Sequence, residues 1–147
     1  MSQTPLPPGY ALSTERAAMQ ADAIHEWLSM ESYWAAGIPF DVVRTVIDNS
    51  AVAGVFYENR QIGFARLVTD YAVFAYLADV YVAAPHRGKG LGKALCSALL
   101  SQEWVSGLRR IALGTRDAHS LYASMGFGPL KNPDRHMEII LKTSYRP

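Results

Sequence analysis

The sequence predicts an α/β protein of the α+β kind, with segments in the order βααβββαβαββ. That order follows from apolar residues that repeat at strand spacing in some segments and at helix spacing in others, and it gives about seven strands and four helices. The 147 residues are expected to form a single domain, residues 1–147, large enough to bury a core. Half of the residues are hydrophobic and 18% are charged, which is typical of globular proteins.

The N-terminal half is predicted to contain a strand, two helices and a hairpin. Asp22 is a plausible N-cap of the first helix, and Gly37 and Pro39 end that helix. A polar turn at residues 58–60 joins the two strands of the hairpin. The predicted elements are a strand from Tyr10 to about Met19, helices at Asp22–Trp34 and Asp41–Asn49, and strands at Ala51–Tyr57 and Gln61–Thr69.

The C-terminal half is predicted to contain a strand, a long helix, a short strand, a short helix and two final strands. Asp117 is the expected N-cap of the short helix, and Gly126 ends it. Residues 132–134 form the turn between the last two strands. The predicted strands are Tyr76–Val82, Arg110–Gly114, Phe127–Leu130 and Met137–Leu141, and the long helix includes Ala94–Leu100.

A glycine-rich loop between the strand that ends at Val82 and the long helix is predicted to bind a phosphate or a pyrophosphate. Alternate glycines let the backbone take positive φ and let a ligand approach the main chain. The amides and the positive dipole end of the following helix attract the same anion. The residues expected to bind it are Arg87, Gly88, Lys89, Gly90, Leu91, Gly92 and Lys93.

Two common phosphate loops do not match this segment. A P-loop needs one more residue between its glycines, and Ala94 stands where it needs a Mg²⁺-binding Ser or Thr. The dinucleotide fingerprint needs two spacers after Gly90 before its last glycine, and an acidic residue about 20 positions on. What remains is an Arg-x-x-Gly-x-Gly pattern at Arg87, Gly90 and Gly92.

This pattern resembles the acetyl-coenzyme A loop of the GCN5-related N-acetyltransferases (GNAT). About 25 residues further on, the stretch from Asp117 to Phe127 resembles the later motif of that family, a short helix with Leu-Tyr that ends in Gly-Phe. The resemblance is specific from about Gln61 onward and rests on element order before it. It implies a mixed central sheet, flanked by the helices, whose fourth and fifth strands splay apart.

The resemblance also implies the cofactor contacts. Acetyl-coenzyme A would be the cosubstrate, with no metal, and its pantetheine arm would pair with the main chain of Val80, Tyr81 and Val82. A bulge in this strand would direct the Val80 N–H to the thioester carbonyl. Asp117 stands where many members have an asparagine near the pantetheine, although an N-cap role alone would explain an aspartate there.

Tyr122 matches the family tyrosine that protonates the leaving sulfur; a tyrosine packed in the core is the alternative. Some members carry a glutamate just before the aspartate of the central strand, but here that residue is Ala78. Asp79 is then the nearest candidate base, although strand alternation would place it on the face of Leu77 and Tyr81, and a solvated or capping role competes. The weaker candidates are Glu31, His25, Asp70 and a chain of waters.

The acceptor is expected to be a primary amine of a small molecule or a peptide. By resemblance it would lie near the first two helices, where this chain is rich in aromatic residues, which favours an apolar or aromatic amine. The residues expected to bind it are Trp34, Tyr33 and Tyr76, and their alternative role is core packing. His119, one turn before Tyr122, is a candidate for cofactor contact, and a histidine on the surface is the alternative.

Composition narrows the other classes of function. A net charge of +1 argues against a nucleic-acid partner, and the single Cys96, expected in the core, forms no internal disulfide. The N-terminus lacks a signal-peptide pattern and no apolar run reaches about 18 residues, so a cytoplasmic protein without a membrane partner is expected. A homodimer is left open. The alternatives to an enzyme are a non-catalytic coenzyme A-binding module and a nucleotide-binding partner protein.

Overall fold

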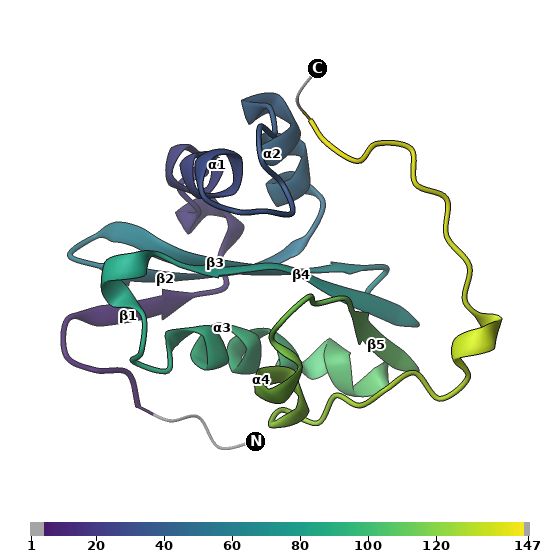
Figure 1. Ribbon diagram of the computed structural model, residues 1–147. Coiled ribbons are helices and arrows are strands. Elements are labelled where there is room, and N and C mark those ends of the chain that lie inside the picture. The colour runs from purple at the N-terminus through teal and green to yellow at the C-terminus, as the bar shows by residue number, and fades with distance from the viewer. Residues whose placement is uncertain (1–4, 146–147) are drawn as a thin grey trace.

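The computed structural model describes residues 5–145 and has a mixed five-stranded sheet at its centre, in the order β1-β2-β3-β4-β5 (Figure 1). The first three pairings are antiparallel and the last, between β4 and β5, is parallel. The predicted fold class is confirmed, with five strands instead of about seven. The strands are β1 (Tyr10–Ser13), β2 (Ala51–Tyr57), β3 (Arg60–Thr69), β4 (Phe74–Val82) and β5 (Arg110–Leu113).

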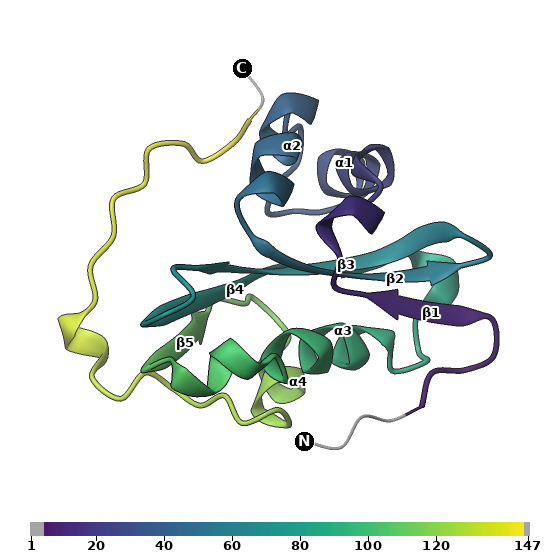
Figure 2. The ribbon, with the colours of Figure 1, turned by 180° about the vertical axis from the view of Figure 1, so that it is seen from behind.

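Two layers of helices cover the two faces of this sheet. The helices α1 (Ala21–Met30) and α2 (Phe40–Asp48) lie on one face, and α3 (Leu91–Leu100) and α4 (His119–Ala123) lie on the other (Figure 2). Each face has its own buried core, because successive residues of a strand point to opposite faces. Phe64 belongs to the core under α1 and α2, whereas its neighbour Ala65 belongs to the core over α3.

Strand β4 contains a bulge that changes which face its residues occupy. Phe64 pairs with Tyr81 and Arg66 pairs with Ala78, so that the single residue Ala65 lies opposite both Asp79 and Val80. Asp79 has φ of 54°, a left-handed conformation that aspartate tolerates better than most residues. The extra residue inverts the alternation, so Leu77 packs on the α3 side and Tyr81 on the α1 side. The expectation that these two residues share a face is therefore wrong.

Strands β4 and β5 separate after a short parallel ladder. Their pairing begins at Phe74 with Arg110 and ends at Leu77 with Leu113, although β4 continues to Val82. The implied splay between the fourth and fifth strands is therefore present. It opens at the carboxyl ends of two parallel strands, which is the usual position of a ligand in such sheets.

The predicted boundaries of the first and the last helix differ most from the structure. The first helix ends at Met30, so Trp34 lies in the loop that follows it, and Asp22 lies in its first turn instead of capping it. The expected cap by Asp117 is also wrong: α4 begins at His119. Thr115 supplies the local hydrogen bond instead, because its Oγ1 accepts the Ala118 N–H at 3.1 Å.

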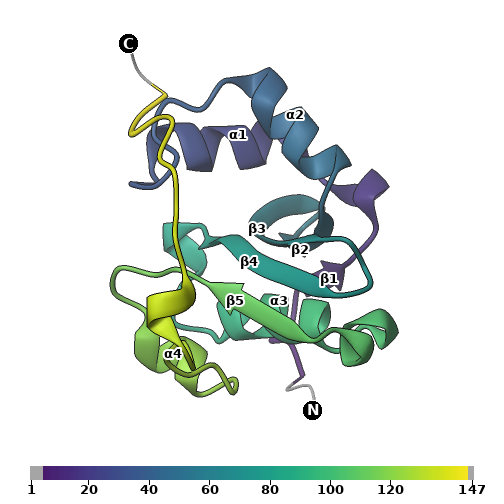
Figure 3. The ribbon, with the colours of Figure 1, turned by 90° about the vertical axis from the view of Figure 1, so that its right-hand side faces the viewer.

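The two strands predicted at the C-terminus do not form within the described residues. After α4 the chain passes a short 3₁₀ turn, η4 (Pro133–Arg135), and continues outside the sheet towards α1 and α2 (Figure 3). The turn leads the chain away from the edge of β5, and a strand without a neighbour has no acceptors for its amides. Residues 137–141 are therefore exposed and unpaired within this chain.

Candidate functional site

A cavity of about 380 Å³ lies at the splay and is here named the cleft cavity. Residues of β4 form one wall, the end of β5 and α4 form another, and the loop after α1 closes it. It brings together all three residues expected to bind the acceptor, both predicted catalytic residues and two of the predicted cofactor residues. These are Tyr33, Trp34 and Tyr76, then Asp79 and Tyr122, then Val80 and Asp117.

The main chain of β4 beside the cleft cavity has free hydrogen-bonding capacity. Within residues 5–145, Ala78 to Val82 have no partner on β5, and Asp79 and Val80 have none on β3 either. An unpaired strand edge accepts an extended ligand as an additional strand. The bulge at Asp79 and Val80 lies in the strand where the resemblance implies one, and it includes Val80, the residue expected to direct its N–H to the thioester.

The glycine-rich loop presents its main chain to open space. Gly88 and Gly90 have φ of 79° and 76°, and a Cβ on either would meet no atom within 4 Å. The first bond of α3 runs from the Ala94 N–H to the Gly90 carbonyl at 3.1 Å, so the preceding amides, those of residues 91–93, have no acceptor inside the helix. Open space above convergent amides at a helix N-terminus fits an anionic phosphate.

Arg87 connects this loop to the end of β4. Its Nε donates to the Val82 carbonyl at 2.8 Å, and its guanidinium lies 5.3 Å from the centre of the Tyr81 ring. The side chains of Lys89 and Lys93 are exposed. The loop therefore carries three cationic side chains, and one of them, Arg87, is held by the end of β4.

Tyr122 is half-buried on α4 and lines the cleft cavity. Its ring meets Phe127 edge to face, with centroids 6.1 Å apart. Burial, together with the nearby Cys96, Tyr33 and Asp117, raises the pKa of Tyr122 to about 12. Its hydroxyl is therefore protonated at neutral pH and can donate a hydrogen bond into the cavity.

Asp79 is held in an ion pair. Its Oδ2 accepts from Arg66 Nε at 2.7 Å, and its Oδ1 accepts from Trp34 Nε1 at 2.7 Å. Arg66 also donates to Ser50 Oγ at 3.2 Å. The Asp79 and Arg66 side chains are only 9% and 18% exposed. Because both carboxylate oxygens are engaged, this arrangement favours a role in positioning Trp34 and the bulge over proton abstraction.

Sequence reasoning missed Arg66, although a signal was present: it is a charged residue in the interior of the largely apolar strand β3, whose other charge, Arg60, is the first residue of the strand. It also missed Arg116, whose guanidinium lies 3.7 Å from the centre of the Tyr33 ring. Tyr145, from the C-terminal segment, lines the cleft cavity as well. Long-range pairing of this kind leaves no local pattern in a sequence.

The weaker base candidates are engaged elsewhere. Glu31 accepts the Tyr81 hydroxyl, and burial together with this carboxylate raises the pKa of Tyr81 to about 12. His25 Nε2 lies 3.0 Å from the Ile38 carbonyl oxygen. Asp70 accepts three backbone amides of the turn before β4, which lowers its pKa. None of the three candidates lines the cleft cavity.

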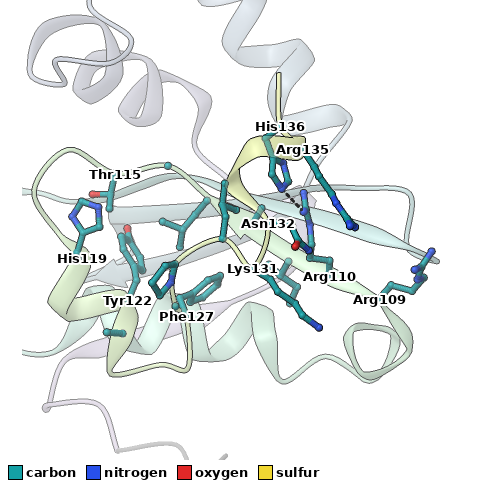
Figure 4. Close-up of a pocket in the computed structure, with 18 residues that line it drawn as sticks. Arg109, Arg110, Thr115, His119, Tyr122, Phe127, Lys131, Asn132, Arg135 and His136 are labelled. Carbon is teal, nitrogen blue, oxygen red and sulfur yellow. Dashed lines mark hydrogen bonds between the residues drawn. The ribbon is translucent and has the colours of Figure 1, made fainter. Parts of the chain in front are cut away.

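A second and larger space, about 1150 Å³, runs along the outer edge of β5 and is here named the β5 groove (Figure 4). Seven consecutive residues, 109–115, line it together with His119 and Tyr122. His119 thus faces this groove and not the cleft cavity. Basic side chains at its rim include Arg110 and Arg135, and Arg110 Nη1 lies 3.2 Å from His136 Nε2.

Within residues 5–145, no group of three or more His, Cys, Asp or Glu side chains has an arrangement suited to a metal ion. None of the helices in this range is both long and apolar enough to cross a membrane.

Comparison with known sequences gives matches over most of the chain. The family model described as the acetyltransferase (GNAT) family matches residues 21–127. A protein of Gibberella zeae described as a "putative acetyltransferase" is 31% identical over 134 residues, which cover 77% of this chain and 75% of that protein. An uncharacterized N-acetyltransferase of Gracilaria tenuistipitata var. liui is 33% identical over 102 residues, 65% of this chain and 55% of its own.

Comparison with solved structures gives a match over nearly the whole chain. The crystal structure of a "putative acetyltransferase belonging to the gnat family" from Xanthomonas campestris pv. campestris has a TM-score of 0.92 and 41% sequence identity. The match covers 97% of this chain and 100% of that one, so it includes most of the C-terminal segment.

Proposed function

The chain belongs to the acetyltransferase (GNAT) family, and from this premise we propose that it is an acetyl-coenzyme A-dependent N-acetyltransferase. The acceptor is a primary amine of a small molecule or peptide. One observation supports the proposal above the others: a free strand edge leads directly from a glycine loop to a protonated, half-buried Tyr122.

The residues present fit the parts of acetyl-coenzyme A. The amides of residues 91–93, with Arg87, Lys89 and Lys93, suit the pyrophosphate. The main chain from Ala78 to Val82, which has no partner on β5 within residues 5–145, suits the amides of the pantetheine arm, which would add to β4 like a strand. An extended ligand that follows this edge from the loop reaches the cleft cavity, where Val80 and Tyr122 lie.

The chemistry divides between two groups of the chain. When the amine attacks the thioester carbonyl, negative charge develops on the carbonyl oxygen, and the Val80 N–H would stabilise it. When the carbon–sulfur bond breaks, the thiolate needs a hydrogen-bond donor, which is Tyr122. Because the pKa of Tyr122 is about 12 and that of a thiol is about 8.5, complete proton transfer is unfavourable, and Tyr122 acts through a hydrogen bond that strengthens as the sulfur leaves.

The acceptor cavity is bounded by aromatic side chains. Tyr33, Trp34 and Tyr76 are each 40–50% exposed, which is unusual for core residues and typical of a binding surface. Asp79 fixes the indole of Trp34, and Arg116 covers the ring of Tyr33. These walls favour an amine with an apolar or aromatic body. A water molecule is proposed as the route by which the amine loses its proton, since the Asp79 oxygens are engaged.

The decisive experiment measures thiol release from acetyl-coenzyme A with a panel of amines. We expect slow release alone and at least about 10²-fold faster release with an aromatic or amphiphilic amine, because proximity and Tyr122 act only when the acceptor is bound. Binding of coenzyme A is measured on the same sample by calorimetry.

Each outcome of this experiment separates the classes of function. Binding of coenzyme A without acceleration by any amine would support the non-catalytic module. Two observations favour that alternative: the Asp79 carboxylate is paired with Arg66, and residue 78 is an alanine instead of a carboxylate. Failure to bind coenzyme A, or displacement of it by ATP or GTP, would contradict the proposal itself.

A further inference from the structure

The cleft cavity contains one carboxylate that has no close partner. Within residues 5–145, two carboxylates line this cavity, those of Asp79 and Asp117. Both oxygens of Asp79 accept hydrogen bonds of 2.7 Å, from Arg66 and from Trp34. Asp117 has one ion-pair partner in the same range, Arg116, and the 3.7 Å between Oδ2 and Nη2 is too long for a hydrogen bond. The Asp117 oxygens can therefore bind a cation that enters the cavity.

The contact between Arg116 and Asp117 does not prevent such binding. The two side chains are 64% and 67% exposed, and an ion pair between exposed side chains contributes little. The guanidinium of Arg116 lies on the Tyr33 ring, 3.7 Å from its centre, and this contact does not involve Asp117. A positively charged ligand can thus approach Asp117 while Arg116 stays on Tyr33.

The charge of the cavity lining favours a ligand with one positive charge. Among the described residues that line it, the charged ones are Arg66, Asp79 and Asp117. The charges of Arg66 and Asp79 cancel in their ion pair, so one negative charge remains, that of Asp117. A primary alkyl amine is an ammonium ion at neutral pH, because its pKa is near that of lysine, about 10.4. A single carboxylate matches an amine with one charge better than a polyamine.

Aromatic rings beside Asp117 add to the attraction for an ammonium group. Trp34 and Tyr76 line the same cavity and are 43% and 40% exposed. Within residues 5–145, no arginine or lysine lies over either ring, whereas Arg116 already lies over the neighbouring Tyr33. The face of an aromatic ring attracts a cation, and tryptophan does so most strongly. The hydrogen bond to Asp79 holds the Trp34 indole in place.

Asp117 also lies near the group proposed to act on the leaving sulfur. Tyr122 lines the same cavity, one turn into the helix α4 that follows Asp117. Burial is the main cause of the raised pKa of Tyr122, and the negative charge of Asp117 contributes to it. An ammonium bound at Asp117 would therefore lie in the same space as the reacting end of the thioester.

We propose that the Asp117 carboxylate binds the ammonium group of the acceptor in the cleft cavity, next to the faces of Trp34 and Tyr76. This inference rests on the proposed function, since it assigns a residue to the acceptor of that reaction. The acceptor class becomes a monoamine with an apolar or aromatic body. Asp117 then belongs to the acceptor and not to the pantetheine arm, where the resemblance would place it.

The test compares two ligands of the same shape that differ in charge. Benzylamine is positively charged at pH 7 and benzyl alcohol is neutral. Their dissociation constants are measured by NMR titration of the full chain with coenzyme A in excess. We expect the wild type to bind benzylamine at least about 10-fold more tightly, because a hydrogen bond between charged groups and a cation–ring contact are available only to the amine.

Three variants locate the preference for charge. Asp117→Asn keeps the size of the side chain and removes the charge, so it should lower the preference to about 2-fold or less. Asp117→Glu should retain most of it. Asp134→Asn is the matched control, an exposed aspartate that lines neither the cleft cavity nor the β5 groove, and should behave as the wild type. The affinity for coenzyme A, measured by calorimetry, should be the same in all four proteins.

Steady-state kinetics with benzylamine provide a second measurement. Because the lost contact holds the bound amine, Asp117→Asn should raise KM for the amine by about 10-fold and change kcat little. A side chain with only a structural role would not change KM selectively.

Two results would overturn this inference. One is an Asp117→Asn protein that retains the full preference for benzylamine. The other is an Asp117→Asn protein that loses affinity for coenzyme A instead, which would assign Asp117 to the cofactor. The preference for charge is measured without an acetyl donor, so it can be absent from a protein that transfers acetyl groups, and a protein that shows it can lack the transfer.

Discussion

At the scale of single residues, Tyr122 combines a half-buried position with a pKa of about 12. Tyr122→Phe removes the hydroxyl and keeps the ring that packs against Phe127. We expect kcat to fall by about 10²-fold with little change in coenzyme A affinity, because the lost hydrogen bond acts on the leaving sulfur. Steady-state kinetics and calorimetry on the same preparations measure both quantities; unchanged turnover would remove Tyr122 from the mechanism.

Asp79 provides a second prediction, on stability. Asp79→Ala leaves the largely buried Arg66 without its carboxylate and places alanine at φ of 54°, so the free energy of unfolding should fall by about 3 kcal/mol. The matched control is Asp22→Ala, because the Asp22–Arg60 pair is exposed on both sides and should cost less than about 0.5 kcal/mol. Urea unfolding of the two variants tests the contrast; equal losses would show that burial of the pair does not matter.

Among single residues, sequence reasoning selected those that belong to a motif, and it missed the contacts that join separate segments. Tyr122, Arg87 and the loop glycines were predicted from local patterns. The Asp79–Arg66 pair joins residues on two strands, and Trp34 bonds to it from a third segment. The spacing of these residues along the sequence therefore does not predict the pair. Whether the predicted residues bind and react as expected stays a prediction that the experiments above address.

At the scale of elements, Gly90 and Gly92 of the glycine-rich loop differ in backbone conformation. Gly90 has φ of 76°, so Gly90→Ala should cost roughly 1–2 kcal/mol of stability through strain alone, with no clash. Gly92 lies in the first turn of α3 with ordinary helical backbone, and its added Cβ would meet only Val82 Cγ2 at 3.9 Å. Gly92→Ala should therefore stabilise the free protein by about 0.5–1 kcal/mol.

Both alanine variants should nevertheless bind coenzyme A more weakly, because a Cβ reduces the approach of a phosphate to the main chain. Thermal unfolding without ligand and calorimetry with coenzyme A measure the two effects separately. A Gly92→Ala protein that is more stable and binds as well as the wild type would show that the pyrophosphate lies elsewhere.

Most elements were predictable because their signals are local. Strand β2 has the predicted bounds, and β3, β4, α2 and β5 differ by one or two residues. The last two strands were not, because residues 137–141 have the composition of a strand but no neighbour in their own chain. The bulge was expected only from the resemblance. It moves the following residues of β4 to the opposite face of the sheet, and this depends on the pairing with β3, which the alternation of apolar residues along the sequence does not show.

At the scale of the whole molecule, three protonated groups make stability depend on alkaline pH. Burial raises the pKa of the Cys96 thiol to about 12, and Tyr81 and Tyr122 also have pKa values raised to about 12. The native state keeps these protons at a pH where the unfolded chain has lost them. Stability should therefore be constant below about pH 8 and should fall as pH rises from there towards 12, by up to about 1.4 kcal/mol per pH unit for each group.

Urea unfolding from pH 7 to 10.5 measures this slope. Between about pH 9 and 10 the unfolded thiol titrates first, so Cys96→Ala should flatten the curve there and leave the tyrosine contribution above it. A wild-type curve with no loss up to pH 10.5 would contradict the assignment.

The pairing of β4 with β5 ends at Leu77, and this affects the stability of the protein when no cofactor is bound. Beyond Leu77, β4 and β5 are no longer hydrogen-bonded to each other, and a bound pantetheine arm would fill the space between them. The cofactor would then also be a structural component: at about one hundred times its dissociation constant it would add about 2.7 kcal/mol to the folding free energy. The protein would then be most susceptible to proteolysis and unfolding after it has released coenzyme A and before it binds acetyl-coenzyme A again.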